Sequence, residues 1–250
     1  TMQIAPPEKI ADLALRYACR SVAFTYNDPV IFYEYLVDTA IACHEQGIKT
    51  VAVTAGYITD LARPAFYKHI DAANVDLKSF DEIFYKKICG GNLQDVLNTL
   101  VYLKNETNVW FEITTLLIPD GNDSESEIHN MCDWIMEKLG PDIPLHFSAF
   151  HPDYKMLDRD CTPKATLINA RDIAIAAGIH YVYTGNVHHI EGDTTFCHKC
   201  HATLIVRDWY ELYEWNLDEK AICPNCGTSC SGVFEKQPGA WGCRRQAIPV

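Results

Sequence analysis

Apolar residues recur along the first 187 residues with two alternating periods. Short apolar runs, typical of buried strands, are separated by longer stretches in which apolar residues fall three and four positions apart, as they do on one face of a helix. The runs predict strands at 21–26, 49–53, 75–78, 109–118, 145–150 and 180–183. This strand–helix order is typical of parallel β/α units.

Several helix ends are also marked in the sequence. Asp28 precedes a proline and predicts a capped helix start, while Ser124 and Glu127 predict a reciprocal capping box. Gly47 follows an apolar stripe, at a position where a left-handed residue commonly ends a helix. A further helix is expected from about residue 59 to residue 69.

Two architectures share this order: an open doubly wound sheet and a partial (β/α) barrel. Asp76 and Lys78 lie two apart on one predicted strand, so both side chains point to the same face. An open parallel sheet has both faces covered by apolar helices, whereas a barrel places polar side chains near the carboxyl ends of its strands. We therefore predict a partial TIM-type barrel over residues 1–190.

The composition changes after about residue 190, which predicts a second domain over 191–250. Two CxxC pairs, separated by a stretch that suits β-hairpins, predict a zinc ribbon with Cys197, Cys200, Cys223 and Cys226 as ligands. Four protein thiolates leave no open coordination position, so the zinc is expected to be structural. The alternatives are a redox pair or unligated thiols. Four neighbouring residues are not expected to be ligands: His198, His201, Cys230 and Cys243.

Composition excludes some classes of function. The formal net charge of −12 disfavours binding to nucleic acid or to anionic membrane surfaces. No apolar run approaches the ~20 residues of a membrane helix, and the start does not resemble a signal peptide. Thr1 before Met2 is untypical of a natural start and favours a cut end. Because the cysteine spacing favours metal binding over disulfides, a reducing, cytoplasmic setting is expected.

Polar residues follow most of the predicted strands. They include 26–28, 54–56, 118–123 and His151, and each alone is typical of a turn or a structural residue. Together they would form one rim, where β/α proteins bind ligands. Asp76 and Lys78 are expected to belong to this site, because buried charges are costly unless they pair or meet a ligand. The alternative is a pair at an exposed strand end. Glu112 is a further candidate for the same polar core.

One family matches these motifs in order. The strings SVAFTYNDPVIFYEY, KTVAVTAGY, NVDLKSF, LLIPDGNDS, HFSAFHPDYK and YVYTGNV, followed by the CxxC pairs, resemble the radical S-adenosyl-L-methionine (SAM) enzyme of the AmmeMemoRadiSam system. That family is similar to pyruvate formate-lyase-activating enzymes. The resemblance implies a partial (β/α)6 barrel with a [4Fe–4S] cluster that binds SAM. It also implies reductive cleavage of SAM to a 5′-deoxyadenosyl radical, which abstracts a hydrogen atom.

The resemblance also implies roles for individual residues. Asp76 and Lys78 match the Asp-x-Lys of activating enzymes, near the SAM carboxylate and the substrate, and are the expected catalytic pair. The expected SAM contacts are Tyr26, Asn27 and Asp28 at the amino group, Thr54 and Gly56 at the ribose and methionine, Ile118 to Gly121 at the adenine, and His151.

The chain departs from the family at two places. The cluster needs Cys-x-x-x-Cys-x-x-Cys, and the sequence contains no such triplet, since Cys223, Cys226 and Cys230 have the reversed spacing. In the family the cluster loop follows the first barrel strand. We therefore expect that strand and loop to lie upstream of residue 1, and this chain to be inactive alone. At the position of Val53, activating enzymes often have an aspartate that helps to bind a monovalent cation. The sequence therefore does not predict whether this chain has such a cation site.

The substrate stays open at this stage. The activating-enzyme likeness implies a glycyl residue of a partner protein, and the family label implies Memo-like or AMMECR-like partners. Small molecules and other side chains are alternatives. A different class of function is a cluster-free β/α scaffold that binds a partner protein through its ribbon. Exposure of Trp209, Tyr213 and Trp215 would favour it. A zinc hydrolase is disfavoured, because four cysteines leave no room for an activated water.

Overall fold

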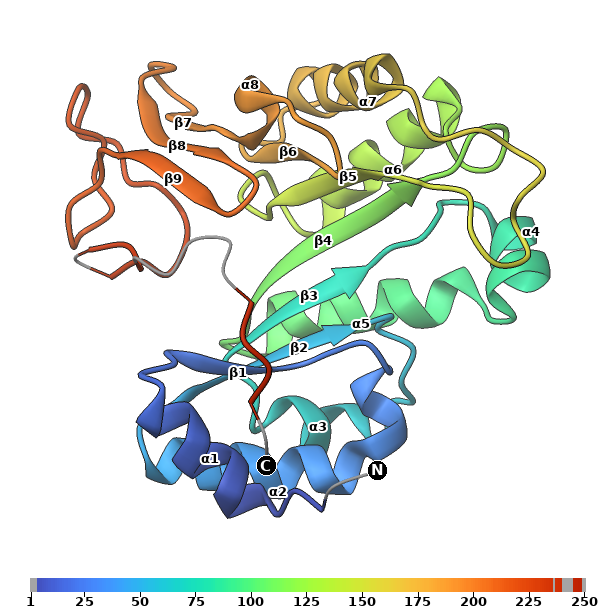
Figure 1. The fold of residues 1–250 in the computed structure, drawn as a ribbon. Helices are drawn as coiled ribbons and strands as arrows, with labels where there is room; N and C mark the ends of the chain where they lie inside the picture. Colours follow the sequence, from blue (N-terminus) through green and yellow to red (C-terminus); the bar gives the residue numbers. More distant parts are fainter. Residues whose placement is uncertain (1–3, 236, 240–244, 249–250) are drawn as a thin grey trace. The chain divides into compact units, whose positions relative to one another are not determined.

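The computed structural model describes residues 4–235, 237–239 and 245–248, so Thr1, Met2 and Cys243 lie outside the described residues. Six strands are hydrogen-bonded in the order β1-β2-β3-β4-β5-β6, and three more form the sheet β7-β8-β9 (Figure 1). The pairs β1–β2, β2–β3, β4–β5 and β5–β6 are parallel. Neighbours in the large sheet are also neighbours in the chain, whereas a doubly wound sheet reverses its order at a switch point. The winding is therefore of the predicted barrel type.

The elements alternate along the chain. The strands of the large sheet are β1 (Ser21–Phe24), β2 (Lys49–Thr54), β3 (Ala72–Asp76), β4 (Trp110–Leu117), β5 (Leu145–Ala149) and β6 (Val182–Gly185). The α-helices are α1 (Pro7–Arg16), α2 (Tyr33–Glu45), α3 (Arg63–Tyr67), α4 (Glu82–Phe84), α5 (Leu93–Glu106), α6 (Glu125–Lys138), α7 (Lys164–Ala176) and α8 (Ile190–Asp193). A 3-10 turn spans Pro29–Phe32 and a π turn Tyr85–Cys89. The ribbon strands are β7 (Thr195–Phe196), β8 (Thr203–Asp208) and β9 (Glu211–Trp215).

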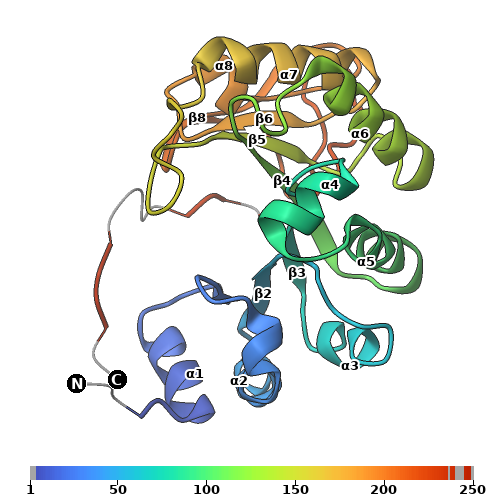
Figure 2. The same cartoon turned by 90° about the vertical axis from the view of Figure 1, so that its right-hand side faces the viewer.

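The chain forms two compact units. The first contains the described parts of 1–77, 90–112 and 246–250, and the second those of 78–89 and 113–245. In the second unit α6 and α7 pack on each other, and α7 packs on β5 and β6 (Figure 2). The ribbon shares a core with β6, in which Tyr181 and Tyr183 pack with Leu204 and Cys223. The predicted domain boundary near residue 190 stays a prediction.

Burial alternates along the strands, which explains why these residues form strands. In and after β3 the buried Ala73, Val75 and Leu77 alternate with half-buried polar residues, including Asp76 and Lys78. Asp76 ends the strand and Lys78 lies beyond it, so the shared face predicted for their side chains stays a prediction. The strand itself begins at residue 72 and ends at residue 76, earlier than predicted, because its start is made of small residues that give a weak strand signal.

Three local predictions were wrong in detail. The helix expected over 59–69 spans only Arg63–Tyr67, because Pro64 has no N–H and fits only a first turn. The last strand is Val182–Gly185, two residues later than predicted. Ser124 caps α6 by accepting from the Glu127 amide at 3.3 Å, but the Glu127 carboxylate accepts instead from Phe80 N–H at 2.7 Å. The capping box is therefore only half formed.

No helix among the described residues is both long and apolar enough to cross a membrane.

Candidate functional site

The carboxylate of Asp28 ties together the loops that follow β1 and β2 in the first unit. Its Oδ1 accepts from Val30 N–H at 3.0 Å, which confirms the predicted cap, here of the 3-10 turn. The Thr54 hydroxyl lies 3.1 and 3.2 Å from the two carboxylate oxygens, and Ala55 N–H donates to Oδ2 at 2.7 Å. Both oxygens are thus engaged by the chain itself. In this geometry Asp28 positions two loops.

The loop after β2 is held in place by buried residues that the sequence pattern did not indicate as site residues. Gly56 has φ +66°, and a Cβ there would lie 2.8 Å from Val75 Cγ1. The Thr99 hydroxyl donates to Gly56 O at 2.7 Å, and Arg63 Nε donates to Thr99 Oγ1 at 3.2 Å. Arg63 also donates to Ile58 O at 3.2 Å and is 6% exposed. The buried side chains of Thr99 and Arg63 therefore donate hydrogen bonds to two carbonyl oxygens of this loop, those of Gly56 and Ile58.

The tip of the loop after β1 is open to solvent. Tyr26 is 99% exposed and has φ +72°, a left-handed conformation that costs a non-glycine residue about 1–2 kcal/mol. Asn27 is exposed, and its side chain has no hydrogen-bond partner among the described residues. Such strain often marks a ligand-binding turn. Asp76, at the end of β3, is half-buried, and Asn74 Nδ2 donates to its Oδ1 at 3.1 Å.

In the second unit, the backbone of Lys78 is fixed on both sides. Its N–H donates to the Tyr85 hydroxyl at 3.0 Å, and its carbonyl accepts from Asn122 Nδ2 at 2.6 Å. Asn122 is 1% exposed. It also donates to Leu116 O at 2.9 Å and accepts from Ile118 N–H at 2.7 Å. One buried amide therefore joins the segment after β3 to the end of β4.

The ends of β4 and β5 are joined in the same way by Thr162. Its hydroxyl donates to Leu117 O at 2.6 Å and accepts from Phe150 N–H at 2.8 Å. Gly121 N–H donates to Ile118 O at 2.9 Å, and a Cβ on Gly121 would lie 3.1 Å from that oxygen.

The side chains next to this junction differ in exposure. Ile118 packs with Phe84 and Phe150. His151, by contrast, is exposed and makes no hydrogen bond among the described residues. It is therefore accessible to a ligand, and no hydrogen bond from the described residues fixes its ring.

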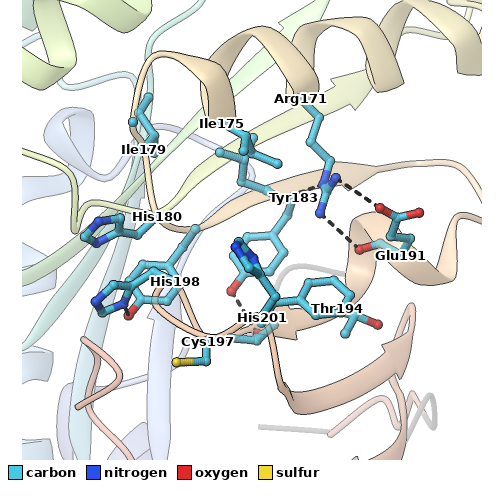
Figure 3. A pocket seen from close by; sticks show the side chains of 15 residues that line it. Arg171, Ile175, Ile179, His180, Tyr183, Glu191, Thr194, Cys197, His198 and His201 are labelled. Atoms are coloured by element: carbon cyan, nitrogen blue, oxygen red, sulfur yellow. Dashed lines mark hydrogen bonds and ion pairs between the residues drawn. The ribbon is translucent and has the colours of Figure 1, made fainter. Parts of the chain in front are cut away.

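A cavity of about 480 Å³ in the second unit lies where the ribbon packs against β6 (Figure 3). Its arginine, Arg171, donates to Val182 O at 3.1 Å and lies 3.6 Å from a Glu191 carboxylate oxygen. The rings of His180 and His198 stack with centroids 4.0 Å apart. His180 contacts Asp142 at 3.0 Å. The polar groups are mostly satisfied internally, so this cavity is best described as part of the packing of the ribbon.

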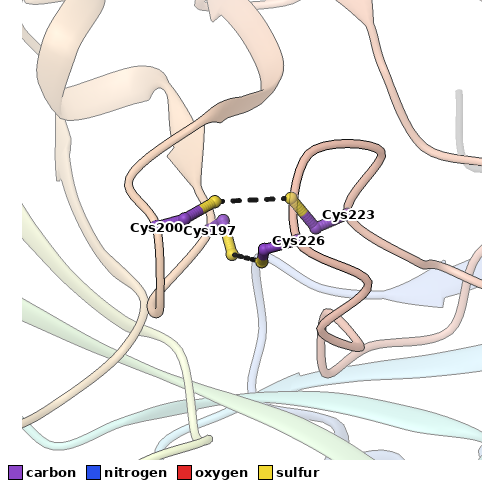
Figure 4. Close-up of side chains that lie close together, drawn as sticks. All are labelled: Cys197, Cys200, Cys223 and Cys226. Atoms are coloured by element: carbon purple, nitrogen blue, oxygen red, sulfur yellow. Dashed lines mark hydrogen bonds between the residues drawn. The ribbon is translucent and has the colours of Figure 1, made fainter.

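The four predicted zinc ligands converge (Figure 4). Their sulfur atoms all lie within 4.8 Å of one another, with Cys197 Sγ 3.6 Å from Cys226 Sγ and Cys200 Sγ 3.7 Å from Cys223 Sγ. These distances exceed the S–S bond of about 2.05 Å in a disulfide. They match the edges of about 3.8 Å in a tetrahedron of 2.3 Å metal–sulfur bonds. The group could therefore hold one metal ion.

Each CxxC pair sits on a tight turn closed at the fourth residue after its first cysteine. His201 N–H donates to Cys197 O, and Gly227 N–H donates to Cys223 O, each at 2.9 Å. Both closing residues are left-handed, with φ +57° at His201 and +73° at Gly227. Thr228 Oγ1 lies 3.3 Å from Cys226 Sγ. Hydrogen bonds with the side chain and the backbone of Thr228, together with those of Cys200 and Cys197, outweigh burial and lower the pKa of Cys226 to about 6. The Cys226 thiolate is thus readily available to a metal.

A model of the radical SAM superfamily matches residues 1–135, more than half of the 250-residue chain. The chain belongs to the radical SAM superfamily. The family implies SAM and an iron–sulfur cluster as cofactors. The matched residues include the loops after β1, β2, β3 and β4, so the positions pinned by Asp28 and Asn122 fall inside the family's region of similarity.

Individual relatives point in the same direction. An uncharacterized protein of Methanocaldococcus jannaschii is 40% identical over 222 residues, covering 88% of this chain and 66% of the relative. The pyruvate formate-lyase-activating enzyme of Clostridium pasteurianum is 28% identical over 155 residues, covering 57% of this chain and 63% of the relative. The chain thus spans about two thirds or less of the length of these relatives.

Among solved structures, a domain of a pyruvate-formate lyase-activating enzyme from Bacteroides vulgatus matches with a TM-score of 0.57 and 18% identity. It covers 66% of this chain and 99% of that domain. At this identity the likeness concerns the fold alone.

The residues of this radical SAM chain fit a single metal ion and an iron–sulfur cluster differently. The sulfur distances at the four cysteines suit a single tetrahedral ion. They do not suit the family's cluster, which needs three thiolates and one iron left open for SAM. Among the described residues this is the one group that could hold a metal. The described cysteines therefore fit a single metal ion, but not the cluster.

Proposed function

We propose that this chain is the SAM-binding and substrate-facing part of a radical SAM enzyme of the activating-enzyme type, related to the AmmeMemoRadiSam group. The observation that carries the proposal is the set of pinned, polar strand-end loops that follow β1 to β4 in the family's motif order. In such enzymes the reduced cluster and SAM together supply a 5′-deoxyadenosyl radical that abstracts a hydrogen atom.

The residues of this chain bind and orient in that scheme. The exposed Tyr26 and Asn27 would meet the SAM amino group, with Asp28 holding their loop against Thr54 and Ala55. Asp76 and Lys78 would face the SAM carboxylate and the substrate. The fixed backbone of Lys78 supports this role, because a precisely placed ammonium needs a rigid attachment point.

The remaining contacts and the partner belong to the same proposal. Thr54 and Gly56 would hold the ribose and methionine, Ile118 to Gly121 the adenine, and His151 would close over SAM. The three cluster cysteines would come from a segment upstream of these 250 residues, which would leave this chain inactive by itself. The partner would be a protein, of Memo-like or AMMECR-like kind, whose glycyl residue loses the hydrogen.

Anaerobic iron–sulfur reconstitution tests this proposal. We expect this chain to gain no iron and to form no 5′-deoxyadenosine. The protein encoded by the whole reading frame should gain about four irons and cleave SAM. A full-length protein that holds no cluster and leaves SAM intact would rule the proposal out.

A pair of glycine variants in the longer protein tests the loop after β2. Gly56→Ala places a Cβ against Val75, whereas Gly47→Ala has the same left-handed strain with nothing within 4 Å. We expect Gly56→Ala to lower 5′-deoxyadenosine formation at least about tenfold and Gly47→Ala to retain it. Equal activities would show that this loop does not hold SAM.

The four-cysteine group would carry structural zinc. The convergence of four thiols with no open position supports structure over catalysis. Zinc content of about one per chain after purification without added metal is the direct measurement.

A second candidate function, a scaffold that binds a partner protein through its ribbon, has one observation in its favour. Trp209 and Tyr213 are 49% and 63% exposed on the β8–β9 hairpin. Trp215, the third residue expected to be exposed, is instead half-buried and packs edge-on against Phe234. This candidate becomes the better one if the full-length protein binds no iron.

A further inference from the structure

A second cavity of the second unit, about 380 Å³, lies between the end of β6 and the turn of the β8–β9 hairpin. Its volume is within the range of about 300–1,000 Å³ that small-ligand pockets occupy. The lining comes from β5, β6 and the ribbon, with His146, Tyr183, Arg207, Trp209 and Tyr210 as its large side chains. Neither the SAM-binding loops nor the four cysteines line this cavity.

The cavity combines one cation with aromatic walls. The Arg207 guanidinium lies over the Tyr183 ring, 4.9 Å from its centroid. Tyr183 is itself fixed, because its hydroxyl lies 2.8 Å from Thr195 Oγ1 and its ring packs 5.0 Å from His146. Trp209 and Tyr210 are 49% and 60% exposed at the mouth. A rigid guanidinium beside flat ring surfaces suits a planar anionic ligand.

In the part of the chain that the structure describes, Arg207 forms no close ion pair, although its charge lies over the Tyr183 ring and acts on Asp193. Among the described residues no carboxylate lies within ion-pairing distance of its guanidinium, in contrast to Arg171, which pairs with Glu191. The acid that shares the cavity is Asp193, whose carboxylate accepts from Trp209 N–H at 3.4 Å. The Arg207 fork is thus available for two parallel hydrogen bonds to a carboxylate.

We propose that this cavity binds a ligand that carries both a carboxylate and a planar ring, with Arg207 binding the carboxylate and the exposed Trp209 and Tyr210 packing on the ring. The ligand is either a free aromatic acid or the carboxyl-terminal aromatic residue of a peptide. As a statement about the substrate, this rests on the proposed function. As a statement about binding, it stands without SAM or a cluster.

Three one-ring probes test the charge preference on the zinc-loaded chain: benzoate, benzamide and benzylamine. Amide chemical shifts, together with the Trp209 indole signal, report binding. Benzoate should bind in the millimolar range expected for so small a ligand, with shifts at residues 146, 184–187 and 207–210, and the other two at least about tenfold more weakly. Benzamide binding as well as benzoate, or shifts at His180 and His198 instead, would overturn the proposal.

Variants assign the binding to Arg207. Arg207→Gln should weaken benzoate at least about tenfold, and Arg207→Lys should fall between Gln and wild type, because it keeps the charge but not the fork. Asp193→Asn should tighten benzoate by removing a nearby negative charge; weaker binding would overturn the proposal. Arg16→Gln, at an exposed position on α1, is the matched control. Zinc content and dispersion of the amide signals that are the same in each variant as in the wild type would exclude misfolding.

Binding of a short peptide distinguishes the two possible ligands, a free aromatic acid and a peptide carboxyl terminus. If Gly-Gly-Phe with a free carboxylate binds at least tenfold more tightly than benzoate, and its carboxyl-terminal amide does not, the ligand is a peptide terminus. If the free peptide binds no better than benzoate, the ligand is a small acid. Either result supports the carboxylate site. Equal binding of the peptide and its amide contradicts it.

Discussion

In the four-cysteine group, the side chains that the sequence marks are the ones that meet. Cys197, Cys200, Cys223 and Cys226 converge to within 4.8 Å, and their spacing alone predicts it. At the strand-end loops the marked residues and the organising residues overlap only in part. Asp28 and Asn122 are marked and also organise the loops, whereas the marked Tyr26 and His151 are exposed. Three further supports, Thr99, Arg63 and Thr162, are not marked.

The difference has a physical basis. A metal site is local in sequence, since each CxxC turn brings two ligands together before any tertiary contact forms. A pinned loop depends on partners far away in the chain: Arg63 and Thr99 are 36 residues apart, and Asn122 and Lys78 are 44 apart. No short-range pattern distinguishes these buried polar residues from ordinary helix or turn residues. The motifs of the strand-end loops are therefore readable from sequence, whereas distant supports such as Arg63 and Thr99 are not.

Loss of the proposed zinc should break the comparison most strongly. Stripping it with a chelator, or Cys226→Ser, should remove binding energy on the order of 10 kcal/mol from the ribbon. We expect the amides of β8 and β9 to lose nearly all protection from hydrogen exchange, while those of β2 keep theirs. Full protection of β8 and β9 after verified zinc release would show that the ribbon core around Leu204 folds without metal.

Asn122→Ala should have the next largest effect, about 3 kcal/mol on the free energy of unfolding. The change leaves Lys78 O, Leu116 O and Ile118 N–H without their partner in a buried place. Urea unfolding at pH 7 measures it. The matched control, Asn130→Ala on an exposed position of α6, should change stability by less than about 0.5 kcal/mol. A loss no larger than the control's would mean that Asn122 does not pin the loop.

The predicted elements show the same division between local and distant causes. The six strands and the helix cap at Ser124 were predictable, because apolar alternation and capping residues act within a few positions. The shortened α3 and the half-formed capping box were not predicted, although Pro64 was a visible signal for the first. Glu127 leaves its own helix for Phe80, 47 residues away, and no local rule could find that partner.

Two carboxylates of the first unit, Asp71 and Asp28, can be compared by the charge of the groups that donate to them. Asp71 ties the starts of β2 and β3 through Lys49, His44 and Thr50 N–H, each within 2.9 Å, whereas Asp28 meets neutral donors. Burial acts to raise the pKa of Asp71, but the hydrogen bonds from Lys49, Thr50 and His44 outweigh it and lower the pKa from 3.8 to about 2. The ionised form is therefore favoured by folding.

The sign of the pH dependence follows from the lowered pKa of Asp71. Its stabilisation, about 2 kcal/mol, is present above pH 4 and is lost as the pH falls from about 4 towards 2. Asp71→Asn should therefore lower stability by about this amount from pH 7 to pH 5, with the gap to wild type narrowing below pH 4. The exposed Asp38→Asn serves as the control in urea melts. A gap that widens on acidification would contradict this.

The smallest expected effect concerns the closing residues of the two cysteine turns. His201 occupies the left-handed position that Gly227 fills in the other turn, with φ +57° against +73°. Relief of that strain, less the entropy that glycine loses on folding, should make His201→Gly a net gain of about 0.5–1 kcal/mol. Zinc competition should show a two- to fivefold higher affinity, and Gly227→Ala a loss of similar size. If His201→Gly weakens zinc binding instead, the imidazole supports the site directly, and the two turns differ in more than their closing residue.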